Sequence, residues 1–378
     1  MRLGFDLRPF LKQETGVGVY FRNLLFELAK LDREDEFFLV SASWKDRFAP
    51  EKIPPFANKM FRDLRWPVRF VDALWYGRQW PTLDAIFRTR LDLTHSPAPL
   101  PLPTKGRRIV TVCDLFFFDE PGRADPGARK HFLKRVETSL RRADGIVAIS
   151  EFTKAALLER FDLDPARIRV TRLGVEASRR IAPDPGSIER TRTALGLPSE
   201  FLLFVGASEP RKNLPALIDA MALIHEKRIK VPLVIVGRPG SGHAALLDRI
   251  AARGMTDQVK LPGYLPDAEV RNLYHAASAL VFPSLCEGFG LPLLEAMAAG
   301  LPAAVSRSGA LPEIGGDSAV YFDPENTSEM ADRIIAVLTD LVLRESLRRT
   351  GPARAAEFRW ETTAARTLDF YREVAGRA

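Results

Sequence analysis

The sequence contains few cysteines and histidines and lacks a long apolar run. Its 378 residues include only two cysteines, Cys113 and Cys286, which excludes a disulfide framework and favours a reducing, cytoplasmic location. The five histidines show no metal-ligand spacing, and we expect neither a metal nor a cofactor. No apolar run is long enough to span a bilayer. Asp6 and Arg8 come too early for a secretory signal.

Basic charge is concentrated in the first half of the chain. The formal net charge is +7, and residues 1–180 carry +9 of it against −2 for the remainder. A basic half favours anionic partners, but no nucleic-acid-binding motif accompanies it, so we expect no nucleic acid partner. Trp66, Trp75 and Trp80 lie in a basic segment of this half. That pattern fits a helix on an anionic membrane surface or a helix packed with its aromatic side chains inward.

Short apolar runs alternate with helical patterns along the chain. We predict one strand–helix series over residues 1–182, a turn-rich linker over 183–199 and a second series over 200–356. The predicted strands lie near residues 2–6, 36–41, 91–96, 107–113, 145–149 and 167–171, then 201–206, 231–236, 258–261, 277–282, 303–306 and 319–322. The pattern predicts an α/β fold of two doubly wound, Rossmann-like domains that face each other across a cleft.

The most informative stretch is residues 284–300, SLCEGFGLPLLEAMAAG, which follows a predicted strand and opens a helix. Gly288 and Gly290 let the backbone approach a ligand closely, and the free amides of the helix start suit an anion or a hydroxyl-rich group. Glu287 and Glu295 frame this loop. Taken alone, each feature also fits the ordinary start of a helix, because a glutamate in a first turn is favoured by the helix dipole.

A second candidate site follows the first strand of the second series. Gly206 opens the loop GASEPRKN, in which Arg211 and Lys212 precede a helix that Asn213 is expected to cap. Two cations beside helix amides suit a diphosphate and would stabilise the charge on a departing nucleoside diphosphate without a metal. An adjacent Arg-Lys pair on a solvated loop is the alternative.

The letters EGFGLPLLEAMA, with glutamates eight residues apart, closely resemble the retaining glycosyltransferases of family 4, also called glycosyl transferases group 1. The resemblance extends over nearly the whole chain, includes bacterial polysaccharide mannosyltransferases, and implies the GT-B fold. It also implies roles for residues of the second domain. Glu287 would lie near the transferred sugar, Glu295 would bind ribose hydroxyls, and Arg211 and Lys212 would bind phosphate. The remaining donor-binding residues implied are Gly206, Tyr264 at the nucleobase, and Gly288, Phe289, Gly290 and Leu291 through their backbone.

The resemblance also assigns residues of the first domain. Gly16 and Gly18 match a glycine loop near the donor phosphates, and the last helix, 357–378, would return to brace this domain. Asp114 is a catalytic candidate, but Cys113 stands before it where many relatives carry a histidine. A thiol cannot replace the imidazole donor. We further expect Cys113 and Cys286 to line one cleft, where nearby cations or amides lower a thiol pKa.

The sequence therefore predicts a retaining, metal-independent transfer of a sugar from a nucleotide-diphosphate donor to a saccharide or lipid-linked saccharide, in cell-surface polysaccharide biosynthesis. GDP-mannose is the first candidate donor by resemblance. The location expected is the cytoplasm or the inner face of the plasma membrane. One alternative is a catalytically weak subunit of the same fold that binds the nucleotide sugar. The reason for considering it is Cys113, which stands where many relatives carry a histidine. A different enzyme on this architecture, such as an epimerase or a phosphorylase, lacks a supporting motif.

Overall fold

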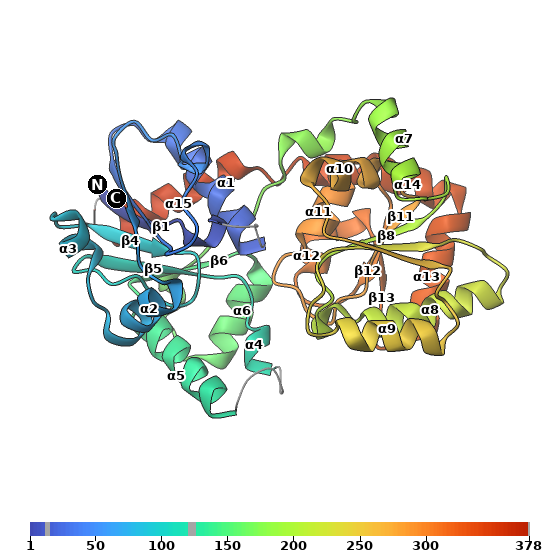
Figure 1. The fold of residues 1–378 in the computed structure, drawn as a ribbon, viewed down its shortest axis with the longest axis horizontal. Helices are drawn as coiled ribbons and strands as arrows, with labels where there is room; N and C mark the ends of the chain where they lie inside the picture. Colours follow the sequence, from blue (N-terminus) through green and yellow to red (C-terminus); the bar gives the residue numbers. More distant parts are fainter. Residues whose placement is uncertain (12–15, 120–125, 377–378) are drawn as a thin grey trace. The chain divides into compact units, whose positions relative to one another are not determined.

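The computed structural model describes residues 1–11, 16–119 and 126–376. The chain divides into two compact units (Figure 1). Unit 1 comprises Met1–Gly174 and Arg359–Ala378, and unit 2 comprises Val175–Phe358. Within the described residues, no helix combines the length and apolar character that crossing a membrane requires.

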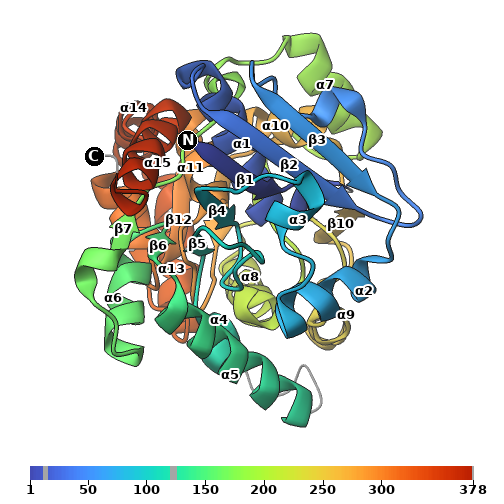
Figure 2. The same ribbon diagram turned by 90° about the vertical axis from the view of Figure 1, so that its left-hand side faces the viewer.

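Unit 1 is built on a seven-stranded sheet with the strand order β3-β2-β1-β4-β5-β6-β7 (Figure 2). Every neighbouring pair is parallel, and the apolar runs predicted as strands are buried on both faces, as parallel sheets require. The strands are β1 (Arg2–Asp6), β2 (Glu36–Ala42), β3 (Lys59–Leu64), β4 (Leu93–Ser96), β5 (Arg107–Val112), β6 (Gly145–Ala148) and β7 (Ile168–Val170).

The helices of unit 1 connect these strands. They are α1 (Gly16–Leu31), α2 (Val68–Asp72), which continues as a π-helical turn (Ala73–Arg78), α3 (Leu83–Phe87), α4 (Phe116–Asp119), α5 (Pro126–Arg142), α6 (Glu151–Arg160) and α15 (Trp360–Val374). Short 3-10 helices span Arg8–Phe10, Pro50–Lys52 and Pro165–Arg167. Ser150 caps α6 as predicted, because its side chain accepts a hydrogen bond from the Thr153 amide.

The C-terminal helix α15 packs on α1 and is fastened to the sheet by a buried hydrogen-bond chain. The Tyr371 hydroxyl lies 2.5 Å from His95 Nδ1, and His95 Nε2 lies 2.7 Å from the Thr111 hydroxyl. Thr111 in turn contacts the Tyr20 hydroxyl at 3.1 Å. Burial lowers the pKa of His95 to about 3, so its ring is neutral and each nitrogen serves one hydrogen bond.

Unit 2 is built on a six-stranded sheet with the order β10-β9-β8-β11-β12-β13, again parallel throughout. Its strands are β8 (Leu202–Val205), β9 (Leu233–Val236), β10 (Val259–Gly263), β11 (Ala279–Phe282), β12 (Ala303–Ser306) and β13 (Val320–Phe322). Its helices are α7 (Pro185–Ala194), α8 (Leu214–Glu226), α9 (His243–Ala252), α10 (Asp267–Ala276), α11 (Leu291–Ala298), α12 (Leu311–Gly315), α13 (Thr327–Thr339) and α14 (Leu341–Ala355). Short 3-10 helices span Ala177–Arg180, Pro210–Lys212 and Gly316–Ser318.

The segment 183–199, predicted as a linker, belongs to unit 2. Its helix α7 packs on α10, where the buried Asn272 side chain donates hydrogen bonds to the Thr191 hydroxyl at 2.9 Å and the Ser187 carbonyl at 3.1 Å. The turn-rich composition indicated a connection, but the helix covers part of a core.

The segment 59–92 contains a strand, β3, that the sequence analysis did not predict. β3 pairs in parallel with β2 along its whole length, although it reads KMFRDL and lacks an apolar run. It lies at the sheet edge, where each of its positions is exposed or half-buried and charged side chains are accepted.

Each sheet winds outward in both directions from a central pair of strands. In unit 1 the direction reverses between β1 and β4, and in unit 2 it reverses between β8 and β11. Open α/β sheets bind ligands outside the carboxyl ends of the two strands at this reversal. The topology therefore points to the loops that follow β8 and β11 in unit 2, and to those that follow β1 and β4 in unit 1.

Candidate functional site

Three predicted site residues meet where the winding of unit 2 reverses. Arg211 and Lys212 lie in the 3-10 helix after β8, and Glu287 lies in the loop after β11. Lys212 Nζ donates to Glu287 Oε1 at 2.5 Å, and Arg211 Nη1 donates to Glu287 Oε2 at 3.0 Å. The Lys212 ammonium also lies 4.6 Å from the centroid of the Phe282 ring. Both carboxylate oxygens of Glu287 are thus bound by cations.

The electrostatics of this cluster keep Glu287 ionised. Burial alone would raise the pKa of this carboxyl, but the charges of Lys212 and then Arg211, with the Lys212 hydrogen bond, outweigh burial and lower the pKa. The three side chains sum to a net charge of +1. The side chains of Lys212 and Glu287 are buried, whereas 25% of the Arg211 side chain is exposed. Arg211 is therefore the cation of this cluster that solvent reaches.

Backbone contacts fix the position of Glu287. The Ala310 amide donates to the Glu287 carbonyl at 2.9 Å, and the Leu285 amide donates to the Arg211 carbonyl at 2.8 Å. Gly309 adopts φ +63°, and a Cβ there would lie 2.4 Å from the Glu287 carbonyl oxygen. Only glycine fits that close approach. The sequence analysis did not identify Gly309, whose role depends on contact with a distant loop.

The loop between the two glutamates supports the site mainly through its backbone. Gly288 and Gly290 are buried, and Gly290 caps α11 with φ +102°. Leu291 is half-buried, and Pro292 fits the first turn. The Phe289 ring is buried and packs edge-on against Phe358 at 5.9 Å. The side chain of Phe289 therefore belongs to the core, and donor binding by this residue stays a prediction for its backbone.

Glu295 does not join Glu287 but forms a second cluster with residues that the sequence analysis missed. The Tyr274 hydroxyl donates to Glu295 Oε2 at 2.9 Å, and Arg179 Nη2 pairs with Glu295 Oε1 at 3.2 Å. The same Arg179 nitrogen contacts Asp267. Burial raises the pKa of Glu295, although Arg179 and Tyr274 act in the opposite direction.

Two further residues predicted to bind the donor, Tyr264 and Gly206, lie in the loops that follow β10 and β8. Half of the Tyr264 side chain is exposed, and the Arg238 guanidinium lies 4.8 Å above its ring. Gly206 follows β8, and a Cβ there would lie 3.6 Å from the Lys212 side chain. Asn213 precedes α8 as predicted, but its side chain makes no cap and instead donates to the Pro324 carbonyl at 2.8 Å.

In unit 1, Gly16 and Gly18 lie in the first turn of α1, and Thr15 lies outside the described residues. Asp114 follows β5, where its carboxylate accepts a hydrogen bond from the Phe116 amide at 3.2 Å. The lowered thiol pKa expected for Cys113 is wrong. Burial, aided by the neighbouring Asp114 charge, raises the pKa of this thiol to about 12.

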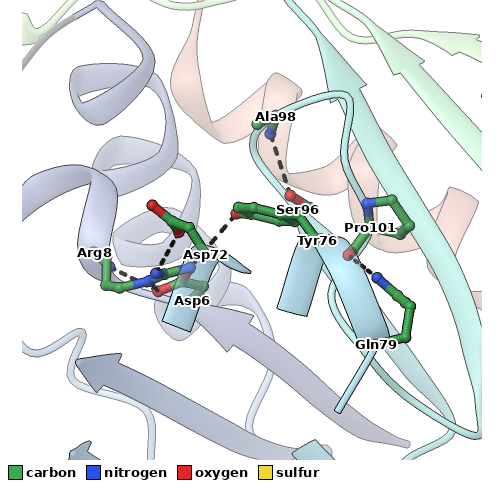
Figure 3. A network of polar contacts seen from close by, with 8 residues as sticks. All are labelled: Asp6, Arg8, Asp72, Tyr76, Gln79, Ser96, Ala98 and Pro101. Carbon is green, nitrogen blue, oxygen red and sulfur yellow. Dashed lines mark hydrogen bonds and ion pairs between the residues drawn. The ribbon is translucent and has the colours of Figure 1, made fainter. Parts of the chain in front are cut away.

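A polar network lies at the reversal of unit 1 (Figure 3). Arg8 Nε donates to both Asp6 oxygens, at 3.0 and 2.8 Å, and Nη1 donates to the half-exposed Asp72 at 2.8 Å. The guanidinium lies 4.8 Å above the Trp75 ring. Trp75 is fully buried, so its predicted place on a membrane surface is wrong. The carboxylates of Asp6 and Asp72 and the Arg8 guanidinium sum to a net charge of −1.

Two family models match this chain. The model for glycosyl transferases group 1 matches residues 187–354, and the model for Glycosyltransferase Family 4 matches residues 15–179. The chain is 29% identical to the O-antigen chain mannosyltransferase B of Escherichia coli over 387 residues, covering 98% of this chain and 100% of that protein.

Solved structures share the fold over the whole chain. A sucrose-phosphate synthase from Thermosynechococcus elongatus matches with a TM-score of 0.77 at 19% identity, covering 100% of this chain and 99% of that one. Anabaena HepE, solved with UDP-glucose, matches with a TM-score of 0.72 at 19% identity, covering 98% and 99%. The two parallel α/β units therefore have the GT-B fold. Residues 187–354 therefore form a domain of the glycosyl transferases group 1, and residues 15–179 form a domain of Glycosyltransferase Family 4.

In the described part of the chain, no group of three or more His, Cys, Asp or Glu side chains is arranged to hold a metal ion. The positive charge at the unit 2 site comes from Arg211 and Lys212.

We predict that Glu287→Gln lowers the free energy of unfolding by about 3–5 kcal/mol, because it leaves two buried or half-buried cations uncompensated. Lys212→Met should lower the free energy of unfolding by less, since Arg211 still compensates the charge of Glu287. The double variant Lys212→Met/Glu287→Gln should lower it by less than the sum of the two single effects. Urea unfolding of the four proteins measures this cycle. Lys227→Met, which breaks the exposed pair with Asp332, is the control and should change little. A Glu287→Gln value equal to this control would contradict the buried pair.

We predict that Cys113 reacts slowly with alkylating agents. With its pKa raised to about 12 from 9.0, the thiolate fraction at pH 8 falls by about a thousandfold relative to an ordinary thiol. Iodoacetamide labelling of a Cys286→Ser variant, followed by mass spectrometry, measures the rate. Labelling as fast as that of a free cysteine peptide would show that the thiol is not buried.

Proposed function

We propose that this chain is a retaining, metal-independent hexosyltransferase that moves a sugar from a nucleotide-diphosphate donor to a saccharide hydroxyl. The observation that carries the proposal is the placement of Arg211 and Lys212 against Glu287 at the reversal of the unit 2 sheet. A cation pair at the end of a parallel strand suits the diphosphate of a nucleotide sugar.

The reaction makes one bond and breaks one. The acceptor oxygen bonds to the anomeric carbon of the sugar on the face from which the diphosphate departs. The bond between that carbon and the phosphate oxygen breaks, and the electron pair leaves with the diphosphate. The acceptor proton passes to an oxygen of the diphosphate. Arg211 and Lys212 stabilise the negative charge that develops on the leaving group, which is the larger part of catalysis at such sites.

Glu287 prepares the site in this proposal. Because it is ionised and binds both cations, it orients their side chains before the donor arrives. Preorganised charge costs no reorganisation during the reaction. Its position beside the cations supports a role near the sugar that the diphosphate carries.

GDP-mannose is the proposed donor, supported by the mannosyltransferase name of the full-length relative from Escherichia coli. The proposed acceptor is a saccharide or lipid-linked saccharide of a cell-surface polysaccharide, supported by that relative's action on an O-antigen chain. Unit 1 is the proposed acceptor domain. Its network of Asp6, Arg8 and Asp72 carries a net negative charge, which suits sugar hydroxyls better than an anion.

A catalytically weak subunit that binds a nucleotide sugar is the second candidate. The observation that favours it is Cys113, which stands before Asp114 and whose raised pKa keeps the thiol protonated. Product formation separates the two candidates, since both bind the donor.

We predict that Lys212→Ala weakens binding of a nucleoside diphosphate more than binding of the nucleoside. The loss of a charge-assisted contact costs about 1.5–3 kcal/mol, and only the diphosphate makes that contact. Calorimetry on the folded protein gives both affinities, and their ratio does not depend on the fraction folded. Turnover of GDP-mannose with a mannan acceptor, measured in parallel, tests the transfer itself. An unchanged ratio would remove Lys212 from the donor site.

We propose that segment 65–80 of unit 1 binds an anionic membrane surface at the cytoplasmic face. It exposes Val68, Phe70 (53%) and Trp80 (63%). Three exposed arginines lie among them, Arg65, Arg69 and Arg78. Exposed apolar side chains interleaved with arginines suit the interface of an anionic bilayer.

We predict that the protein floats with vesicles containing phosphatidylglycerol and less with phosphatidylcholine alone, and that salt weakens the association. The variant Phe70→Ser/Trp80→Ser should float less. Trp44→Ser is the matched control, because Trp44 is equally exposed (69%) but lies outside the segment. Equal flotation with both lipids would leave the aromatic side chains without a membrane role.

A further inference from the structure

We propose that Arg179 and Tyr274 are positioning residues that hold the Glu295 carboxylate so that its exposed edge accepts hydrogen bonds from the two ribose hydroxyls of the nucleotide. This inference rests on the proposed function, because it requires a nucleotide donor in unit 2. It assigns roles to two residues that neither the motif nor its spacing indicated.

The geometry separates a buried side of Glu295 from an exposed one. Each carboxylate oxygen has one protein partner: Oε2 accepts a hydrogen bond from the Tyr274 hydroxyl at 2.9 Å, and Oε1 forms an ion pair with Arg179 Nη2 at 3.2 Å. Tyr274 and Arg179 are 1% and 6% exposed, whereas 20% of the Glu295 side chain is exposed. An ionised carboxylate offers about four acceptor positions. Two partners on the buried side leave the outer positions for a ligand that donates hydrogen bonds.

Arg179 is held in a way that its own packing does not explain. Its side chain comes from the 3-10 helix Ala177–Arg180, which packs on α11, and its guanidinium lies 5.7 Å from the centroid of the Tyr274 ring. Nη2 serves both Glu295 and Asp267. Within residues 1–11, 16–119 and 126–376, Nε and Nη1 have no hydrogen-bond partner. Burying a cation with two nitrogen atoms that lack hydrogen-bond partners costs free energy, so a favourable interaction elsewhere must offset that cost.

The effect of Arg179 on Glu295 supplies that favourable interaction, because the guanidinium opposes the rise in pKa that burial causes and so favours the ionised carboxylate. Burial raises the pKa of this carboxyl, and Asp267 and Glu176 raise it further. Arg179 is the charge that opposes them, followed in effect by the Tyr274 hydrogen bond. The His275 ring contacts the Arg179 backbone, and burial lowers the pKa of that ring. Only the ionised carboxylate accepts at every position, so Arg179 keeps Glu295 able to receive two hydroxyl donors.

The chemistry selects a diol over other ligands. A carboxylate repels phosphate, and its two oxygens match two adjacent hydroxyl donors. Glu295 lies in the first turns of α11, downstream of the loop that begins at Glu287, the residue that binds Arg211 and Lys212. A nucleotide whose diphosphate binds those cations carries one adjacent pair of hydroxyls on its ribose, and the ribose is joined to that diphosphate.

The test compares a nucleoside diphosphate with its 2′-deoxy and 3′-deoxy counterparts by calorimetry. GDP, ADP and UDP are screened first, and the series is built on the nucleotide that binds most tightly. In the native protein each deoxy compound should bind about tenfold more weakly, the size of one charged hydrogen bond. In Tyr274→Phe and Arg179→Met this ratio should fall toward one. The preference for diphosphate over nucleoside should persist, because Arg211 and Lys212 are untouched.

The pH dependence distinguishes positioning from a merely structural role. Removing Arg179 raises the pKa of Glu295 further, so the ribose preference that remains in Arg179→Met should disappear at a higher pH than in the native protein as the pH falls. Taking the ratio of two affinities at each pH cancels the titration of the phosphates. Arg249→Met is the control, since Arg249 pairs with Asp219 at an exposed position of the same unit; it should change neither the ratio nor its pH dependence.

The outcomes separate the two proposals. If the native protein binds none of the nucleoside diphosphates, the proposed function fails. If it binds one with a ribose preference that Tyr274→Phe and Arg179→Met leave intact, the positioning role is overturned and the proposed function stands. Tyr274→Phe removes only a hydroxyl, so it decides the matter even if Arg179→Met does not fold.

Discussion

The ion pair between Lys212 and Glu287 is the constraint on which the site of unit 2 depends. It joins the loop after β8 to the loop after β11, at the point where the winding of the sheet reverses. A buried pair of this kind gains little stability over well-packed apolar side chains, because desolvation offsets the Coulomb attraction. Its value lies in fixing a cation pair where a diphosphate would arrive. The close approach of Gly309 to the Glu287 backbone lies in the same loop region, where a Cβ at position 309 would meet the Glu287 carbonyl oxygen.

The two units place polar clusters at equivalent points of equivalent sheets but give them opposite charge. The unit 2 cluster has two cations around one carboxylate, whereas the unit 1 cluster has two carboxylates around Arg8. Both clusters are anchored by short, buried contacts rather than by flexible surface pairs. A net positive site suits a diphosphate and a net negative one suits hydroxyl groups. This difference supports the proposed division of labour between donor and acceptor, because each unit by itself carries the charge that its proposed ligand requires.

Local sequence predicted the elements and residues whose determinants are close in sequence. Apolar runs identified the buried parallel strands, Ser150 indicated the start of a helix, and the stretch around Glu287 and Glu295 predicted the candidate site. Features decided by distant contacts were not predictable. β3 is a strand because β2 lies beside it, and Trp75 is buried because it packs in an apolar core cluster with side chains such as Phe38 and Leu83. Arg179 lies in a turn with no periodic pattern, so nothing local marks it as a partner of Glu295. The segment 183–199 has the composition of a linker, yet it packs within unit 2, where the buried Asn272 side chain donates a hydrogen bond to Thr191.

The two glutamates of the motif have opposite electrostatic environments, and this bears on which group takes the acceptor proton. Two cations lower the pKa of Glu287, whereas burial raises that of Glu295 despite Arg179. A carboxylate with a lowered pKa and both oxygens bound to cations is a weak base. Glu295 is engaged by Tyr274 and Arg179. Glu287 is therefore poorly equipped to remove a proton from an acceptor hydroxyl, and Glu295 lies in the separate cluster that is proposed to bind ribose. The departing diphosphate gains basicity as its bond to the sugar breaks, which supports the proposed transfer of the acceptor proton to a diphosphate oxygen.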